Sequence, residues 1–348
     1  MRDSRRWGLA LALASAVLFG ASTPASKWML GALPPFQLAG LLYLGAALGT
    51  GSWLLREARG APSPPLDRAN RRRLAGAILL GGVAGPLLLL YGLRLALASS
   101  VSLLLNLEVA ATGALGAWLF REPLGARGWI AVAGITAAGA LVSGSAGWPG
   151  LAAAALVAAA CLCWGVDNQL TARIDGITPA RAAFWKGAVA GSANLAIGVA
   201  TAPFAAKLSS VAAALGVGAL SYGASLALYI AASQQLGATR AQAVFASAPF
   251  LGAALSWVGL GEPVGRVQLA GAALLALCVG LLLRARHEHA HRHDALEHLH
   301  SHRHDDGHHL HDHAAAAPSI RHSHWHRHEP IAHAHPHWPD LHHRHRHR

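Results

Sequence analysis

The sequence predicts an all-α polytopic membrane protein with ten transmembrane helices, arranged as two inverted five-helix repeats, and a disordered histidine-rich tail. Three observations lead to this prediction. Of the 348 residues, 53% are hydrophobic and 13% are charged, about half the charged share of a soluble domain. Long apolar runs recur along residues 7–283, and all 23 histidines follow residue 286. The composition excludes a wholly disordered chain, a disulfide scaffold and an ordinary cytosolic enzyme.

Each apolar run approaches the roughly 20 residues that a helix needs to cross a bilayer. None alternates as a strand would, and a backbone in lipid must pair its own polar groups, so we expect helices. Pro86 and Pro249 fall inside two runs, where each should kink its helix. In chain order, the expected helices are 7–30, 35–55, 74–95, 99–120, 128–142, 151–170, 180–200, 211–232, 241–260 and 267–283.

The distribution of Lys and Arg predicts the orientation. With the N-terminus inside, fourteen of these residues lie on the inner side and four on the outer side, which satisfies the positive-inside rule. Ten crossings return the C-terminus to the inner side. We therefore expect a bacterial inner (plasma) membrane protein with both termini in the cytoplasm. The body carries +11 of the net charge of +12, so the basic excess reports topology and predicts no nucleic-acid partner.

The two halves of the body echo each other. The segment Glu122-Pro123-Leu124-Gly125 recurs 140 residues later as Glu262-Pro263-Val264-Gly265. Phe19-Gly20 in the first helix is echoed by Trp164-Gly165 in the sixth, and the second helix of each half has two glycines four residues apart. Three echoes in the same order indicate a duplication.

The duplication divides the chain into a first repeat (1–145), a second repeat (146–283) and a tail (284–348). Five crossings per repeat is an odd number, so the two repeats must have opposite orientations in the membrane. Inverted repeats are common in transporters, whose substrate site lies near the midplane where the repeats meet.

Several gapped motifs occur along about residues 7–283. They are Leu18-Phe19-Gly20 with Lys27, Leu104 to Glu108, Phe120 to Pro123, Trp164-Gly165, Lys186-Gly187, Leu236 to Arg240, Ala248-Pro249-Phe250 and Gly261-Glu262-Pro263. Together they resemble the EamA family of the drug/metabolite transporter superfamily. This resemblance implies two five-helix repeats and the movement of small solutes, and it implies no particular substrate. The tail resembles a subgroup of bacterial members with histidine-rich C-termini.

Polar side chains inside apolar helices are candidates for the substrate path, because a charge at the bilayer centre costs about 2.5–3.5 kcal/mol. Glu108 is the first candidate, since a carboxyl group in low dielectric can exchange a proton or a cation. Asn106 lies two residues earlier, on the opposite face of the helix, so one of the two should line a cavity. The alternative for Glu108 is a structural hydrogen bond.

Asp167 lies one turn after Trp164, so both should share a face, and Asp167 is either functional or a helix cap. Lys186 is a counter-ion for Glu108 or Asp167, or it reaches the inner surface. Lys27 follows Thr23-Pro24, which favours a broken helix, or it reaches the outer surface.

The tail has histidine at many alternate positions, with carboxylates nearby. This chemistry suits Zn, Ni, Cu or Co, and the composition predicts disorder without metal. A pH-sensitive tether or a low-complexity expansion are alternatives. The candidate metal ligands are His287, His289, His291, His293, His298, His300, His302, His304, His308, His309, His311, His313, His333, His335 and His337.

We therefore expect a transporter that carries a small metabolite or drug-like solute by alternating access, with a metal-binding cytoplasmic tail and no required cofactor. One alternative is an exporter of a divalent transition metal, or a metal complex, fed by the tail. A second is a membrane-tethered metal buffer or sensor without transport. The expected partners are the lipid bilayer, a small solute and transition-metal ions, with a homodimer left open. The spans contain no catalytic pairing of the kind that an enzyme needs.

Overall fold

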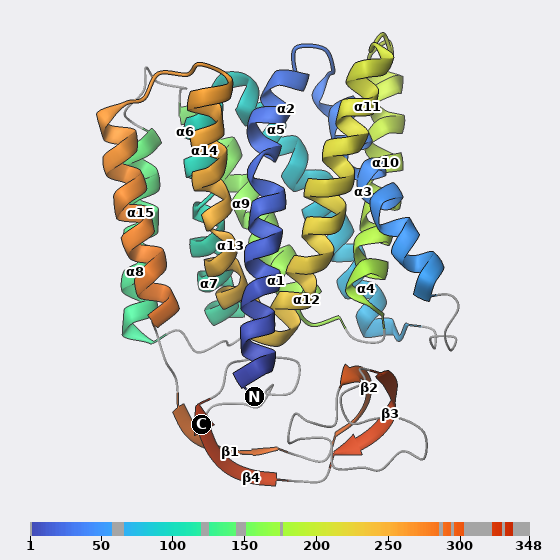
Figure 1. The fold of residues 1–348 in the computed structure, drawn as a ribbon, viewed down its shortest axis with the longest axis vertical. Helices are drawn as coiled ribbons and strands as arrows, with labels where there is room; N and C mark the ends of the chain where they lie inside the picture. Colours follow the sequence, from blue (N-terminus) through green and yellow to red (C-terminus); the bar gives the residue numbers. More distant parts are fainter. Residues whose placement is uncertain are drawn as a thin grey trace.

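The computed structural model describes most of the membrane body and four short segments of the tail. In the body it describes residues 2–57, 66–119, 125–143, 151–174 and 177–284. In this part of the chain the helices form a bundle, and the start of the first helix and the end of the last lie at the same end of it (Figure 1). An even number of crossings produces this arrangement.

The described helices join end to end into ten rods that match the ten predicted spans in order, to within a few residues. In several rods the α-helix is divided by a wide turn, which is a π-helical turn, or by a short break. The rods are α1 (Arg2–Gly20) with α2 (Ser22–Met29); α3 (Pro35–Glu57); α4 (Arg68–Ala77), η1 (Ile78–Ala84) and α5 (Gly85–Leu95); α6 (Ala98–Leu104) and α7 (Leu107–Leu119); α8 (Ala126–Ser143); α9 (Leu151–Thr171); α10 (Pro179–Thr201); α11 (Leu208–Val217), η2 (Gly218–Ala224) and α12 (Ser225–Leu236); α13 (Ala238–Phe245) and α14 (Ser247–Gly259); and α15 (Arg266–Arg284).

Seven of these ten described rods are long and apolar enough to cross a membrane. The other three, α8, α10 and α15, pack against rods of the same bundle: α8 against α15, and α10 against α3. The surface of the bundle carries large apolar side chains, among them Trp118, Leu208 and Val258, each at least 80% exposed. Many Ser, Thr, Asn and Gln side chains are buried instead. An apolar exterior around a partly polar interior is what a lipid environment requires, so the protein is a multi-pass membrane protein.

The interruptions recur at a constant spacing in the two halves. The π-helical turns η1 and η2 begin 140 residues apart, and so do the starts of α4 and α11, α5 and α12, α7 and α14, and α8 and α15. The spacing equals that of the two Glu-Pro segments in the sequence. The duplication seen as short motifs is therefore also present as matching irregularities of the helices.

The two prolines inside spans behave differently. Pro86 is the second residue of α5, directly after η1, so the wide turn accommodates the proline that cannot donate to the preceding turn. Pro249 is the third residue of α14, just after the break at Ala246. Each proline thus lies beside an interruption of its helix. The matching interruptions of the other half, η2 and the break between α6 and α7, occur without one, since Leu226 and Val109 stand at the equivalent positions.

Helices α3 and α10 are in backbone contact through glycine. A Cβ atom added to Gly187 would come within 2.7 Å of the backbone carbonyl oxygen of Tyr43 and the backbone nitrogen of Ala47. One added to Gly191 would come within 2.6 Å of the backbone nitrogen of Leu44. Distances below 3.0 Å are not tolerated, so only glycine permits this approach. Small residues at membrane helix interfaces typically serve this purpose.

The prediction of a disordered tail is wrong for part of it. The structure describes four strands: β1 (Glu288–His293), β2 (Leu296–His302), β3 (His322–His328) and β4 (Ile331–Pro336). β1 pairs antiparallel with β4, and β2 with β3. The physical reason is the two-residue period of the sequence, which matches the period of a strand, whereas the prediction considered composition alone. The other tail residues lie outside the described part of the chain.

Candidate functional site

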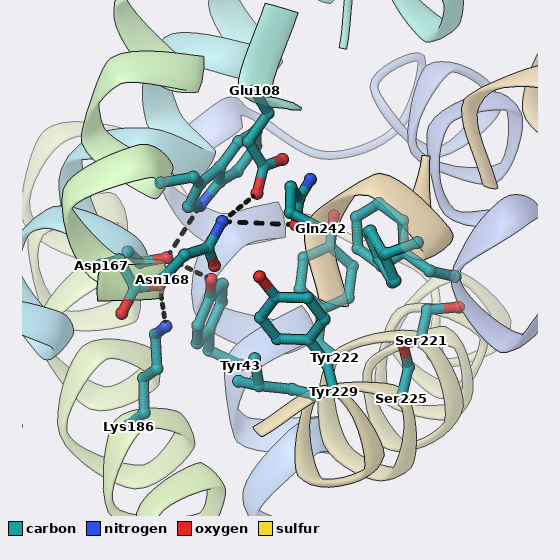
Figure 2. A pocket seen from close by; sticks show the side chains of 15 residues that line it. Tyr43, Glu108, Asp167, Asn168, Lys186, Ser221, Tyr222, Ser225, Tyr229 and Gln242 are labelled. Atoms are coloured by element: carbon teal, nitrogen blue, oxygen red, sulfur yellow. Dashed lines mark hydrogen bonds and ion pairs between the residues drawn. The ribbon is translucent and has the colours of Figure 1, made fainter. Parts of the chain in front are cut away.

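A cavity with about 500 Å³ of empty space lies inside the bundle, between the two halves (Figure 2). Part of this space is open to solvent. The first half contributes four residues from α1, α3, η1 and α7, and the second half contributes the rest. The lining residues are Phe19, Tyr43, Gly81, Glu108, Trp164, Asp167, Asn168, Lys186, Ser221, Tyr222, Ser225, Leu226, Tyr229, Gln242 and Phe245.

One side of the cavity contains an ion pair. The Lys186 ammonium on α10 binds Oδ2 of Asp167 on α9, and the two residues are only 2% and 3% exposed. Within the described part of the chain, Oδ1 of Asp167 accepts no hydrogen bond. Burial of an ion pair is costly unless the charges compensate each other, so each of these groups depends on the other.

Asn168 links the two halves across the cavity. Its Nδ2 donates to Oε1 of Glu108 at 2.8 Å, to the Thr112 hydroxyl at 3.1 Å and to Oε1 of Gln242 at 3.3 Å. Figure 2 shows Asn168 between Glu108 and Gln242, with Asp167 beside it on the same helix. The amide therefore fixes the orientation of the Glu108 carboxyl group and does not neutralise its charge.

The wide turn η1 presents backbone carbonyls to side chains of other helices. The Gly81 carbonyl accepts from the Tyr43 hydroxyl at 2.5 Å and from Nε1 of Trp164 at 3.1 Å, and the Gly82 carbonyl accepts from Asn194 at 3.1 Å. The cause is local: Pro86 has no N–H to donate to the preceding turn, so carbonyls there need other donors. Two cavity donors, Tyr43 and Trp164, are thereby occupied.

Five aromatic rings form a continuous aromatic arc: Tyr43, Tyr222, Phe19, Phe245 and Tyr229, in that order. The centroids of neighbouring rings are 5.4, 5.5, 5.2 and 5.2 Å apart. These are favourable distances for tilted and edge-to-face aromatic contacts. Every ring of the arc lines the cavity, and the rings come from α1, α3, η2, α12 and α13, so the arc ties both halves together.

The structure brings four of the six predicted path residues together. Glu108, Asp167, Lys186 and Trp164 all line the cavity. Of the two counter-ions considered for Lys186, Asp167 is the one that it binds.

Asn106 and Lys27 are not brought to the cavity. Asn106 lies at the break between α6 and α7, where Nδ2 donates to the Leu103 carbonyl at 3.2 Å. Lys27 donates to the carbonyls of Leu93 and Ala96 at 2.7 and 2.8 Å. These acceptors lie at the C-terminal end of α5, where carbonyls lack partners within the helix. Lys27 therefore caps a neighbouring helix.

Sequence reasoning missed most of the uncharged lining. Ser221, Tyr222, Ser225 and Tyr229 belong to one rod, and the spacings of four and seven residues place them on one helical face. This polar stripe in an otherwise apolar span was a usable signal. Gln242 is a further buried polar side chain in a span, and the same search would have found it.

The predicted metal ligands of the tail cannot be compared with a geometry. His287, His304, His308, His309, His311, His313 and His337 lie outside the described residues, and the others lie on strands of which the backbone alone is described. Among the residues that were described with side chains, no group of three or more His, Cys, Asp or Glu could hold a metal ion.

Comparison of the sequence with known protein families finds one family that matches most of the chain. The model of the EamA-like transporter family matches residues 6–144 and, a second time, residues 151–284. An uncharacterized transporter of Methanothermobacter thermautotrophicus is 26% identical over 291 residues, which cover 76% of this chain and 82% of that protein.

A solved crystal structure has a similar fold. It superposes with a TM-score of 0.61 and 17% sequence identity over 81% of this chain and 98% of the other. At this level of identity, the likeness concerns the fold alone.

Proposed function

The chain belongs to the EamA-like transporter family, and from this premise we propose that the central cavity binds a small solute and carries it across the membrane by alternating access. The observation that carries the proposal is the cavity itself. It lies between the two halves and is lined by residues of both, among them an ion pair, a carboxyl group and the aromatic arc. A transporter needs such a site, since a solute must be bound between two gates.

Inverted symmetry of the halves supports alternating access. The helical interruptions recur at a spacing of 140 residues, and each half contributes five rods in the described part of the chain. Five crossings per half give the two halves opposite orientations, so each can adopt the conformation of the other. This exchange would open the cavity first on one side and then on the other.

Two tryptophan substitutions in one rod test the role of the cavity. Leu226 lines the cavity, whereas Leu220 is 58% exposed on the surface of the bundle. Leu226→Trp should fill the cavity and abolish counterflow of a transported solute in proteoliposomes. Leu220→Trp adds the same bulk facing lipid and should leave the flux unchanged. Equal flux in the two variants would exclude the cavity as the path.

The topology of the proposal places both termini in the cytoplasm of a bacterium. Lys207, just before α11, would then lie on the outer side. In a background without the three native cysteines, Lys207→Cys should react with a membrane-impermeant maleimide in intact cells. A cysteine added to the tail should react only after the membrane is opened. Labelling of both from outside would reject this orientation.

We retain metal binding by the tail as a second proposal. It is supported by the alternating histidines and by the strand register, which pairs His289 with His335, His291 with His333 and His300 with His324. Purified full-length protein should then retain Zn, Ni, Co or Cu after desalting, and a chain ending at residue 284 should not. Equal metal content in both proteins would reject the proposal. If the chain ending at residue 284 still transported the organic solute at an undiminished rate, the metal bound by the tail would be a signal and not the transported species.

A further inference from the structure

The charges that line the cavity do not balance. Glu108 and Asp167 are the acidic residues of the described lining, and Lys186 is its basic residue. Lys186 is bound to Asp167, so with Glu108 ionised the cavity has one negative charge without a cation of the protein. A charge in a low-dielectric interior needs a partner, and the space beside Glu108 is open to a guest.

Several hydrogen-bond donors of the lining are also already in use. The Tyr43 hydroxyl and the Trp164 indole donate to the Gly81 carbonyl, and the Asn168 amide donates within the cluster of Glu108 and Gln242. The donor that the structure describes for the Glu108 carboxylate is the neutral Asn168 amide on Oε1. A solute that brings positive charge therefore finds an anionic partner on this wall.

The aromatic arc lines the same cavity. It indicates what the uncharged part of the solute should be. Five rings, each in contact with the next, offer an aromatic surface, and the faces of aromatic rings attract cations. This surface suits a carbon body and does not suit a bare metal ion, which needs several N, O or S ligands at once. Among the residues described with side chains, no group of three His, Cys, Asp or Glu could supply those ligands.

We propose that the cavity selects a monovalent organic cation, an amine or ammonium compound with a compact apolar body. Its nitrogen lies against the Glu108 carboxylate and its body against the aromatic arc. This assignment rests on the proposed function, because it names the class of solute that the transport site accepts. Asp167 and Lys186 keep each other neutral and so leave Glu108 as the charge that selects the guest.

The test is equilibrium binding to the purified full-length protein in detergent. The probes are phenethylamine, its neutral analogue phenethyl alcohol and its anionic analogue 3-phenylpropionate, with phenethyltrimethylammonium as a second cation. Binding is followed by tryptophan fluorescence, because Trp164 lines the cavity, and by calorimetry. Loss of a charge-assisted contact changes affinity by about tenfold or more, so each cation should bind at least about tenfold more tightly than the alcohol, and the anion more weakly still.

Two variants connect this preference to the proposed residue. Glu108→Gln should abolish the preference, so that the amine and the alcohol bind equally. Asp67→Asn is the matched control, because Asp67 caps α4 through the Asn70 nitrogen at 2.7 Å, outside the cavity, and asparagine caps a helix as well. This control should retain the full preference for cations.

The outcomes distinguish failure of the proposed solute class from failure of the proposed transport function. Equal or tighter binding of the alcohol or the anion, or a cation preference that survives Glu108→Gln, would overturn the assignment of solute class and leave the transport cavity intact. Absence of binding by both cations would also overturn the assignment. If Leu226→Trp, which fills the cavity, changed neither binding nor flux of any solute, the proposed function itself would fail.

Discussion

Substitution of Lys186 by methionine removes the ammonium group while keeping an unbranched side chain of similar length. Because Asp167 is 3% exposed and Oδ1 has no donor within the described part of the chain, this variant leaves a carboxylate buried with no described partner on either oxygen. Removal of one member of a buried ion pair costs about 3–5 kcal/mol. We expect Lys186→Met to lose stability by this amount, and Asp167→Asn by a comparable one.

The double variant Asp167→Asn/Lys186→Met is the decisive member of the series. It removes both charges, and neutral replacements for a buried pair often restore most of the stability. Its free energy of unfolding should therefore lie within about 1–2 kcal/mol of the wild-type value. The coupling between the two sites is then large, as expected for groups in direct contact.

Thermal unfolding of the full-length protein in detergent measures these differences. At about 2–4 °C per kcal/mol, Lys186→Met should lower the midpoint by about 6–20 °C, and the double variant should recover most of this loss. Additive losses in the double variant would show that the two side chains do not stabilise each other. A Lys186→Met protein as stable as wild type would refute the reasoning that the carboxylate depends on this ammonium.

Three further substitutions have defined outcomes in the same thermal assay. Lys27→Gln should lower the free energy of unfolding by roughly 1–3 kcal/mol, because two carbonyls at the end of α5 lose a charged donor. The flux per folded molecule should stay unchanged. A change in which solutes are carried would instead place Lys27 in the substrate path. Glu262→Gln should cost about 1–2 kcal/mol, since its carboxylate accepts from the Ala98 and Ser99 nitrogens at the start of α6; an unchanged midpoint would mean that this cap is not formed. Gly187→Val should reduce the yield of folded protein strongly, because its Cβ would overlap the α3 backbone; a stable variant would show that the two helices can separate.

The spans and the charged part of the site could be predicted from the sequence because both follow from the cost of charge in lipid. Apolar runs indicated the ten described rods, seven of which are long and apolar enough to cross a membrane, and Glu108, Asp167 and Lys186 stood out as charges within such runs. The partner of Lys186 could not be predicted. Sequence separation does not determine which carboxylate an ammonium meets. The bundle decides it, because α9 and α10 both pack against η1 and so bring Asp167 and Lys186 together.

Other parts of the site depend on how the helices pack, which cannot be inferred from a single sequence. An aromatic residue in a span faces either lipid or the interior, so Phe19 and Tyr43 could not be assigned to the cavity without the bundle. Lys27 was considered for the path or for the membrane surface, yet it contacts the end of α5. In the tail, composition predicted disorder, while the period of the sequence was compatible with the strands that the structure describes.

The glycine contact between α3 and α10 restricts how these two helices can shift against each other. Each is the second rod of its half, so the contact joins corresponding elements, and their backbones touch at Gly187 and Gly191 with no side chain between them. Two rods in such contact cannot slide past each other by a turn without a steric collision, whereas they can rotate slightly about the line of contact. In the proposed transport cycle, the α3–α10 contact would serve as the pivot: a rocking motion about it would change the shape of the cavity while the two halves stay joined.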